Sequence, residues 1–80
     1  MVTIKLYGLL QEKYGKSRLD VEAGTIREAL SCVAKKGADE KLLRSCVIFV
    51  NDKPLRGAAR YAVKLHDGDE LALLPPVSGG

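Results

Sequence analysis

The chain is poor in the residues from which metal sites are built. It contains one histidine, His66, and two cysteines, Cys32 and Cys46, which are too far apart for a CxxC site. Zinc sites draw on several clustered cysteine and histidine ligands, so we expect no bound metal. We interpret the cysteines as buried or partly buried free thiols, which is typical of the reducing cytoplasm.

Aromatic residues and concentrated charge are also scarce. The chain has no tryptophan, one phenylalanine and three tyrosines, and its 13 basic and 10 acidic residues give a net charge of +3. Bases and acids are interleaved, so we expect no nucleic-acid partner. No apolar run approaches the roughly 18 residues that cross a bilayer, and the start MVTIKLYG lacks the apolar region of a signal peptide. We therefore expect a cytoplasmic protein with no membrane partner.

Recognisable catalytic motifs are missing as well. The glycines are too dispersed for a phosphate-binding loop, and no serine lies in a nucleophile elbow. His66 and Asp67 are neighbours in the turn HDGDE, but side chains of adjacent residues seldom converge. The sequence therefore predicts no autonomous active site and no bound cofactor.

Alternation of apolar and polar residues predicts three strands. VTIKLY would place Val2, Ile4 and Leu6 toward a core; SRLDVEAG follows the same pattern, and ELALLP forms the last strand, which ends because proline cannot donate to a ladder. CVIFV is apolar throughout, which indicates a strand covered on both faces or lying centrally in a sheet. A weak pattern after NDKP allows one short edge strand.

One long helix is predicted over TIREALSCVAKKG. Thr25 and Glu28 have the spacing of a capping box, and Gly37 can end the helix. An apolar stripe at helical spacing consists of Ile26, Ala29, Leu30, Val33 and Ala34. We expect a short helical turn over 9–14, and either an irregular segment or a helical turn over 38–45.

This order of elements predicts an α+β fold. A helix with a single apolar stripe can cover one face of a mixed sheet, with the first and last strands parallel neighbours in its centre. That arrangement is the β-grasp, or ubiquitin-like, fold. We expect residues 1–74 to form this domain and residues 75–80 to form a flexible tail.

The tail has a composition suited to reaching into another protein. Pro75 and Pro76 favour an extended exit, and the six residues 75–80 span up to about 20 Å. Gly79 and Gly80 lack side chains, so they fit a narrow channel. The α-carboxylate of Gly80 is a poor electrophile, but adenylation by ATP in a separate enzyme would open it to attack by sulfur or by an amine.

DGDELALLPPVSGG resembles the C-terminus of the small subunits of molybdopterin synthase, a family of ubiquitin-like sulfur carriers. VTIKLYGLLQEKYGK and FVND are similar to the family's first strand and helix and to its central strand and turn. The resemblance covers nearly the whole chain, and its specific part is the ending PPVxGG.

This resemblance implies a function for the tail. The Gly80 carboxylate would be adenylated by a ubiquitin-activating-like adenylyltransferase and converted to a thiocarboxylate with sulfur from a donor protein. Insertion of Pro75, Pro76, Val77, Ser78 and Gly79 into the large subunit of molybdopterin synthase would then deliver sulfur for the dithiolene of molybdopterin. The resemblance also implies a heterotetramer of small and large subunits.

The resemblance further implies an apolar docking surface on the sheet, for which Tyr7, Leu73 and Leu74 are the candidates. Family members often carry an aromatic pair before the two prolines, where this chain has leucines that lack the flat aromatic contact. This difference bears on the docking partner and leaves the tail chemistry unchanged.

Three other functions are compatible with the sequence. The chain could be the related sulfur carrier for thiamine thiazole, although that group is generally shorter and does not typically end in PPVxGG. It could be a ubiquitin-like modifier joined to lysines, since the activating step is the same. It could also be an interaction module whose tail has no chemical role.

Overall fold

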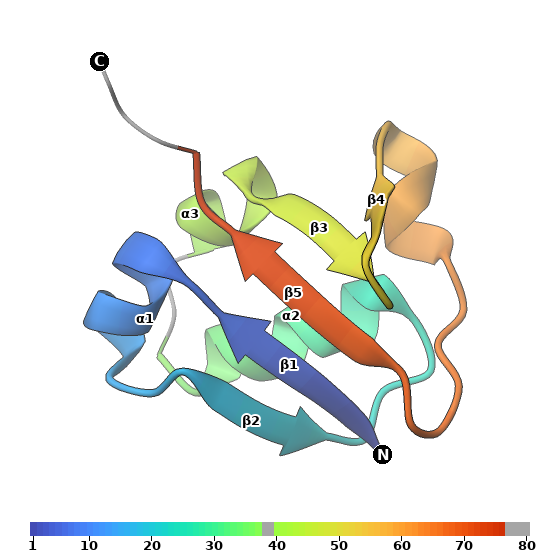
Figure 1. Cartoon of the computed structure of the whole chain (residues 1–80), viewed down its shortest axis with the longest axis horizontal. Coiled ribbons are helices and arrows are strands. Elements are labelled where there is room, and N and C mark those ends of the chain that lie inside the picture. Colours follow the sequence, from blue (N-terminus) through green and yellow to red (C-terminus); the bar gives the residue numbers. More distant parts are fainter. Residues whose placement is uncertain (38–39, 77–80) are drawn as a thin grey trace.

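The computed structural model describes residues 1–37 and 40–76, and in these ranges the chain forms five strands, three α-helices and one short 3-10 helix (Figure 1). The strands are β1 (Val2–Leu6), β2 (Arg18–Val21), β3 (Val47–Val50), β4 (Lys53–Leu55) and β5 (Glu70–Leu74). The helices are α1 (Gly8–Tyr14), α2 (Ile26–Lys35), α3 (Glu40–Ser45) and the 3-10 helix η1 (Ala58–Ala62).

The strands form one mixed sheet in the order β2-β1-β5-β3-β4. β1 and β5 are parallel neighbours, with Ile4 beside Leu71 and Leu6 beside Leu73. The other pairs, β1 with β2, β3 with β5 and β3 with β4, are antiparallel. The predicted β-grasp arrangement, with the first and last strands side by side inside the sheet, is therefore confirmed.

Helix α2 covers one face of this sheet and lies behind the strands in Figure 1. The Thr25 hydroxyl caps its start by accepting a hydrogen bond from the Glu28 N–H at 3.2 Å. In a complete capping box the Glu28 carboxylate would accept from the Thr25 backbone N–H. Here it accepts from the Thr25 hydroxyl instead, at 3.3 Å. The apolar stripe of α2 packs against inward side chains of the strands. The largest fully buried side chains are Val2, Ile4, Leu6, Leu10, Ile26, Val33, Ile48, Leu71 and Leu73.

The segment after β3 differs most from the sequence-based expectation. Asn51 and Asp52 have φ of 49° and 69° and form the tight connection between β3 and β4, because asparagine and aspartate tolerate the left-handed region. The edge strand β4 is only Lys53–Leu55, and it contains Pro54, which an edge position tolerates. The chain then turns through η1, which the weak sequence pattern did not indicate.

Asn51 also ties this hairpin to the turn before β5. Its side chain accepts from the Glu70 N–H at 3.0 Å and donates to the Asp69 carboxylate at 3.0 Å. The Asp69 carboxylate accepts a further bond from the His66 N–H at 2.8 Å, and this bond, together with the one from Asn51, holds its pKa below the ordinary value. His66 and its acidic neighbours therefore shape a turn, in agreement with the structural role that the sequence predicts.

Cys46 is buried, whereas Cys32 is half-buried, and both are free thiols. The Cys46 Sγ–H donates to the Leu42 carbonyl at 3.1 Å, and burial raises the pKa of this thiol to about 11. Because the thiolate is the reactive form, we expect iodoacetamide at neutral pH to modify Cys46 about a hundredfold more slowly in the folded protein than in urea. Peptide mass spectrometry over time measures both rates, and equal rates would contradict this assignment.

No helix within the described ranges combines the length and the apolar character needed to cross a membrane.

Candidate functional site

The candidate site is the end of the sheet at which the chain leaves β5. β5 ends at Leu74, and Pro75 and Pro76 follow outside the ladder, since proline has no N–H to donate. In Figure 1 this exit lies at the same end of the sheet as the start of α1. The tail residues Val77, Ser78, Gly79 and Gly80, which the sequence assigns to insertion and chemistry, lie outside the described residues.

Gly8 lies next to Pro75, the first residue after β5. A Cβ atom built at this glycine would lie 3.3 Å from Pro75 Cγ, closer than side chains normally approach, and the φ of Gly8 is +56°. Both facts favour glycine, which has no side chain and enters the left-handed region at little cost. The neighbouring Tyr7 N–H donates to the Leu73 carbonyl at 3.3 Å. The start of α1 therefore lies against Pro75, at the point where the chain leaves the sheet.

The sheet face opposite α2 carries an apolar patch beside this exit. Side chains on a strand alternate between faces, so the buried Ile48, Leu71 and Leu73 identify the positions between them as outward-facing. Val47 is 46% exposed and pairs with Leu74, and Phe49 pairs with both Ala72 and Pro54. We call Val47, Phe49, Pro54, Ala72 and Leu74 the open-face patch. No helix of the described ranges covers this face in Figure 1.

Of the predicted docking residues, Tyr7 and Leu74 are accessible and Leu73 is not. Tyr7 is 43% exposed at the end of β1, and Leu74 is half-buried in the open-face patch. Leu73 is 0% exposed and packs in the core under α2, so its side chain offers no surface to a partner. Leu73 is therefore withdrawn as a docking candidate, and Tyr7 and Leu74 stay predictions.

Val47 and Phe49 belong to this surface and were missed in the sequence. The run CVIFV indicated a strand that is covered on both faces or central, and β3 is indeed flanked by β5 and β4. Only one of its faces is covered, however, because α2 lies on one side of the sheet. The run CVIFV itself could have identified Val47 and Phe49, because alternate residues of a strand in a two-layer fold face away from the helix.

A polar strip borders the open-face patch on the side of β1 and β2. Lys5 pairs with Ala72 across the ladder, and its ammonium lies 3.2 Å from the Glu70 carboxylate. The Thr3 hydroxyl donates to the Asp20 carboxylate at 2.7 Å. Exposed pairs of this kind contribute little to folding stability, but a charged rim beside an apolar centre is the usual anatomy of a docking surface.

The described residues bring no metal-ligand cluster together. Within 1–37 and 40–76, no three histidine, cysteine, aspartate or glutamate side chains lie in a group that could hold a metal ion.

A protein-family model and curated proteins match this chain. The model of the ThiS family matches residues 4–80. A molybdopterin synthase sulfur carrier subunit from Aspergillus niger is 43% identical over 44 residues, which make up 55% of this chain and 50% of that protein. The matched part thus spans about half the length of the curated relatives.

Solved structures match over nearly the full chain. Small archaeal modifier protein 1 from Methanosarcina acetivorans has a TM-score of 0.80 at 30% identity, covering 99% of this chain and 95% of that chain. The complex of subunits 1 and 2 of the molybdopterin-converting factor from Helicobacter pylori contains a chain with a TM-score of 0.73 at 26% identity, covering 99% and 97%. These likenesses agree with the ubiquitin-like β-grasp fold described above.

Proposed function

Because the chain belongs to the ThiS family, we propose that it is a sulfur carrier that supplies sulfur from its C-terminal glycine for the dithiolene of molybdopterin. The observation that carries the proposal is the extent of the family match, which runs from β1 through Gly80 and so includes the Gly-Gly end. The names of the curated relatives, which are molybdopterin synthase sulfur carrier subunits, support molybdopterin as the product.

Loading of the tail requires two partners. An adenylyltransferase similar to ubiquitin-activating enzymes uses ATP to convert the Gly80 carboxylate to an acyl adenylate and releases pyrophosphate. A sulfur donor protein then delivers sulfur at the oxidation level of sulfide to the activated carbonyl carbon. The new carbon–sulfur bond replaces the bond to the phosphate, AMP leaves, and a thiocarboxylate remains on Gly80. The carrier binds no cofactor in this scheme, and the ATP belongs to the activating partner.

Delivery requires the tail to enter the large subunit of molybdopterin synthase. Pro75 and Pro76 hold the exit extended, and Val77 to Gly79 form a narrow stem that carries the thiocarboxylate into the partner. The contact between Gly8 and Pro75 supports this role, because it fixes the starting direction of the stem relative to the sheet. Cyclic pyranopterin monophosphate is the acceptor, and water supplies the oxygen that returns the thiocarboxylate to a carboxylate when its sulfur is transferred.

The open-face patch, together with Tyr7, is the surface that holds the large subunit while the tail is inserted. The patch includes Leu74, the last residue before the tail, and this position supports the assignment. The tail has only a short distance to cross before it enters a partner bound there. A stable interface buries about 800 Å² on each side, so the polar strip with Lys5 and Glu70 would form its rim. The Helicobacter pylori structure is a complex of two subunits, which supports a pairing of small and large subunits. The heterotetramer and the cytoplasmic location are proposed from the resemblance alone.

Mass spectrometry of the chain after incubation with its adenylyltransferase, ATP and a sulfur donor tests this proposal. We expect the intact mass to rise by the difference between sulfur and oxygen, with the change located in the C-terminal peptide. The loaded protein should then generate molybdopterin with the large subunit of molybdopterin synthase, whereas unloaded protein should not. An unchanged mass would refute the carrier function, and productive transfer only to thiazole synthesis would reassign the pathway.

A second candidate function is that of a ubiquitin-like modifier. It is favoured by the likeness to small archaeal modifier protein 1, which covers 99% of this chain at 30% identity. The same acyl adenylate would then be attacked by a lysine amine, forming an isopeptide bond as AMP leaves. Branched peptides that carry Gly79 and Gly80 on a lysine of another protein would favour this function over sulfur transfer.

Replacing Leu74 with aspartate tests the docking surface. The substitution places a charge in the apolar part of the patch, and we expect the dissociation constant for the large subunit to rise about tenfold, which corresponds to roughly 1.4 kcal/mol. Isothermal titration calorimetry measures this change. Ala59→Asp is the matched control, because it adds the same charge at an exposed position of η1 outside the patch. Equal binding by both variants would place the docking surface elsewhere.

A further inference from the structure

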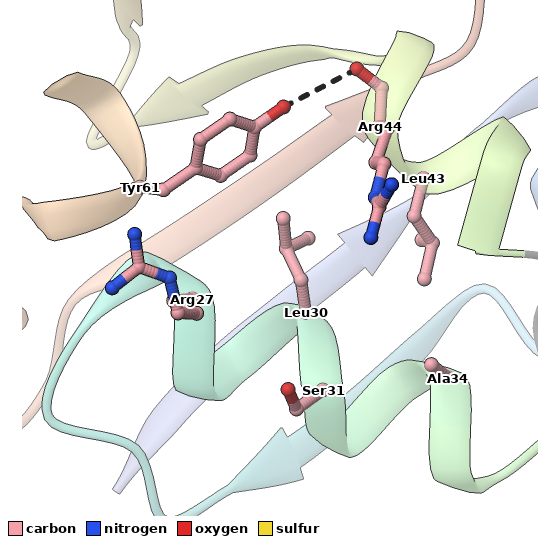
Figure 2. Close-up of a pocket in the computed structure, with 7 residues that line it drawn as sticks. All are labelled: Arg27, Leu30, Ser31, Ala34, Leu43, Arg44 and Tyr61. Atoms are coloured by element: carbon pink, nitrogen blue, oxygen red, sulfur yellow. Dashed lines mark hydrogen bonds between the residues drawn. The ribbon is translucent and has the colours of Figure 1, made fainter. Parts of the chain in front are cut away.

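A groove on the helix side of the molecule is not used by the function proposed above. It has a volume of about 550 Å³ and lies between α2, α3 and η1 (Figure 2). Its lining residues are Arg27, Leu30, Ser31, Ala34, Leu43, Arg44 and Tyr61. Since α2 covers the sheet on the side away from the open-face patch, a partner in this groove and a partner on the patch would occupy different faces.

The centre of the groove is apolar. Figure 2 shows Leu30 standing between the aromatic ring of Tyr61 and the side chain of Leu43, with Ala34 further along α2. The Tyr61 hydroxyl is held in place, because it accepts from an Arg60 N–H at 2.8 Å and donates to the Arg44 carbonyl at 3.3 Å. The Arg60 guanidinium lies over the Tyr61 ring at 4.5 Å. The aromatic wall is therefore fixed and can receive an apolar side chain.

The rim of the groove is positive. The guanidinium groups of Arg27 and Arg44 stand on opposite sides of Leu30 in Figure 2. Neither group pairs with an acid of the described residues: the ion pairs found there join Met1 with Asp67, Lys5 with Glu70, and His66 with Asp69. No carboxylate lies among the lining residues, and the Ser31 hydroxyl adds a further hydrogen-bonding group. Two arginines around an apolar centre complement an acidic ligand that also carries an apolar group.

We propose that this groove binds a short acidic peptide segment of a partner protein, with one apolar side chain of the segment between Leu30 and Tyr61 and carboxylates on Arg27 and Arg44. A peptide suits the groove better than a small anion, because only a peptide brings carboxylates for the two arginines together with an apolar side chain for the Tyr61 ring. A partner bound here could hold the carrier while the tail and the open-face patch are engaged elsewhere. This inference does not depend on the sulfur chemistry.

NMR titration of the isotope-labelled full chain tests the inference. The probe is a capped peptide of sequence DELDE, and the matched control peptide NQLNQ keeps the leucine and lacks the charges. We expect DELDE to shift amide signals of α2, α3 and η1 with a dissociation constant of about 1 mM, and to weaken as salt is added, since exposed charges are screened. NQLNQ should bind at least about fivefold more weakly.

Substitutions distinguish this groove from general attraction to a basic protein. Arg27→Gln and Arg44→Gln should each raise the dissociation constant about twofold to fivefold, and the double substitution about tenfold, the range of exposed charge pairs. Arg56→Gln removes the same charge at an exposed position outside the groove and should have no effect. Equal weakening by Arg56→Gln, equal binding of NQLNQ, or the same shifts with inorganic phosphate at equal affinity would each overturn the proposal.

Discussion

Deletion of Gly80 is expected to reduce sulfur loading to the background level while leaving the fold unchanged. The deletion moves the carboxylate back by one residue, about 3.3–3.6 Å along an extended tail, which removes it from the position that the proposed activation requires. A displacement of only 1 Å can lower a rate by about a hundredfold. Intact-mass analysis after incubation with the adenylyltransferase, ATP and sulfur donor measures loading.

The deletion should not alter folding, because the buried apolar residues of the described ranges 1–37 and 40–76 all lie between Val2 and Leu73. Thermal unfolding of the truncated and full-length chains is the control, and we expect equal midpoints. Addition of one glycine after Gly80 should impair loading as well, since it shifts the carboxylate in the other direction. Normal loading of the truncated chain would contradict a role of the Gly80 carboxylate.

Replacing Gly8 with alanine is expected to lower the rate of sulfur loading by about tenfold to a hundredfold. The new methyl group would lie 3.3 Å from Pro75 Cγ, so the proline must shift and the tail must leave the sheet in a different direction. The positive φ of Gly8 adds a conformational cost of roughly 1–2 kcal/mol for a residue with a side chain. Initial loading rates and denaturant unfolding separate these two effects.

Gly15→Ala is the matched control. Gly15 also has a positive φ, of +84°, but nothing lies within 4 Å of a Cβ atom built there. This substitution should therefore cost a similar free energy of unfolding and leave the loading rate within about twofold of the unsubstituted chain, because only backbone strain is introduced. If both variants load at the same rate, the contact with Pro75 does not position the tail.

Most of the fold could be predicted because its main elements carry strong local patterns. The alternation in VTIKL and ELALL, and the apolar stripe of α2 behind its Thr25 cap, identify two strands and a helix that can bury their apolar sides only against one another. The region between β3 and β5 was less predictable. η1 has no buried residue, so no periodic apolar pattern marks it in the sequence.

The candidate site was predictable only in part. Because Leu73 and Leu74 are adjacent in a strand, they are predicted to face opposite sides of the sheet. Which of the two is buried depends on the face that α2 covers. The contact between Gly8 and Pro75 is between residues far apart in the chain, and it arises only because β1 and β5 are parallel neighbours. No local pattern contains such a contact. The groove beside Leu30 and Tyr61 likewise exists only once η1 is placed against α2.

The position of β5 between β1 and β3 has a mechanical consequence. Ladder hydrogen bonds run across the strand direction, so a pull on the tail along β5 loads the bonds to both neighbours at the same time, in shear. A strand at the edge of the sheet, by contrast, is held on one side only. If a partner pulls on the tail, as the proposed insertion requires, the force therefore acts on a strand that is held by hydrogen bonds on both sides.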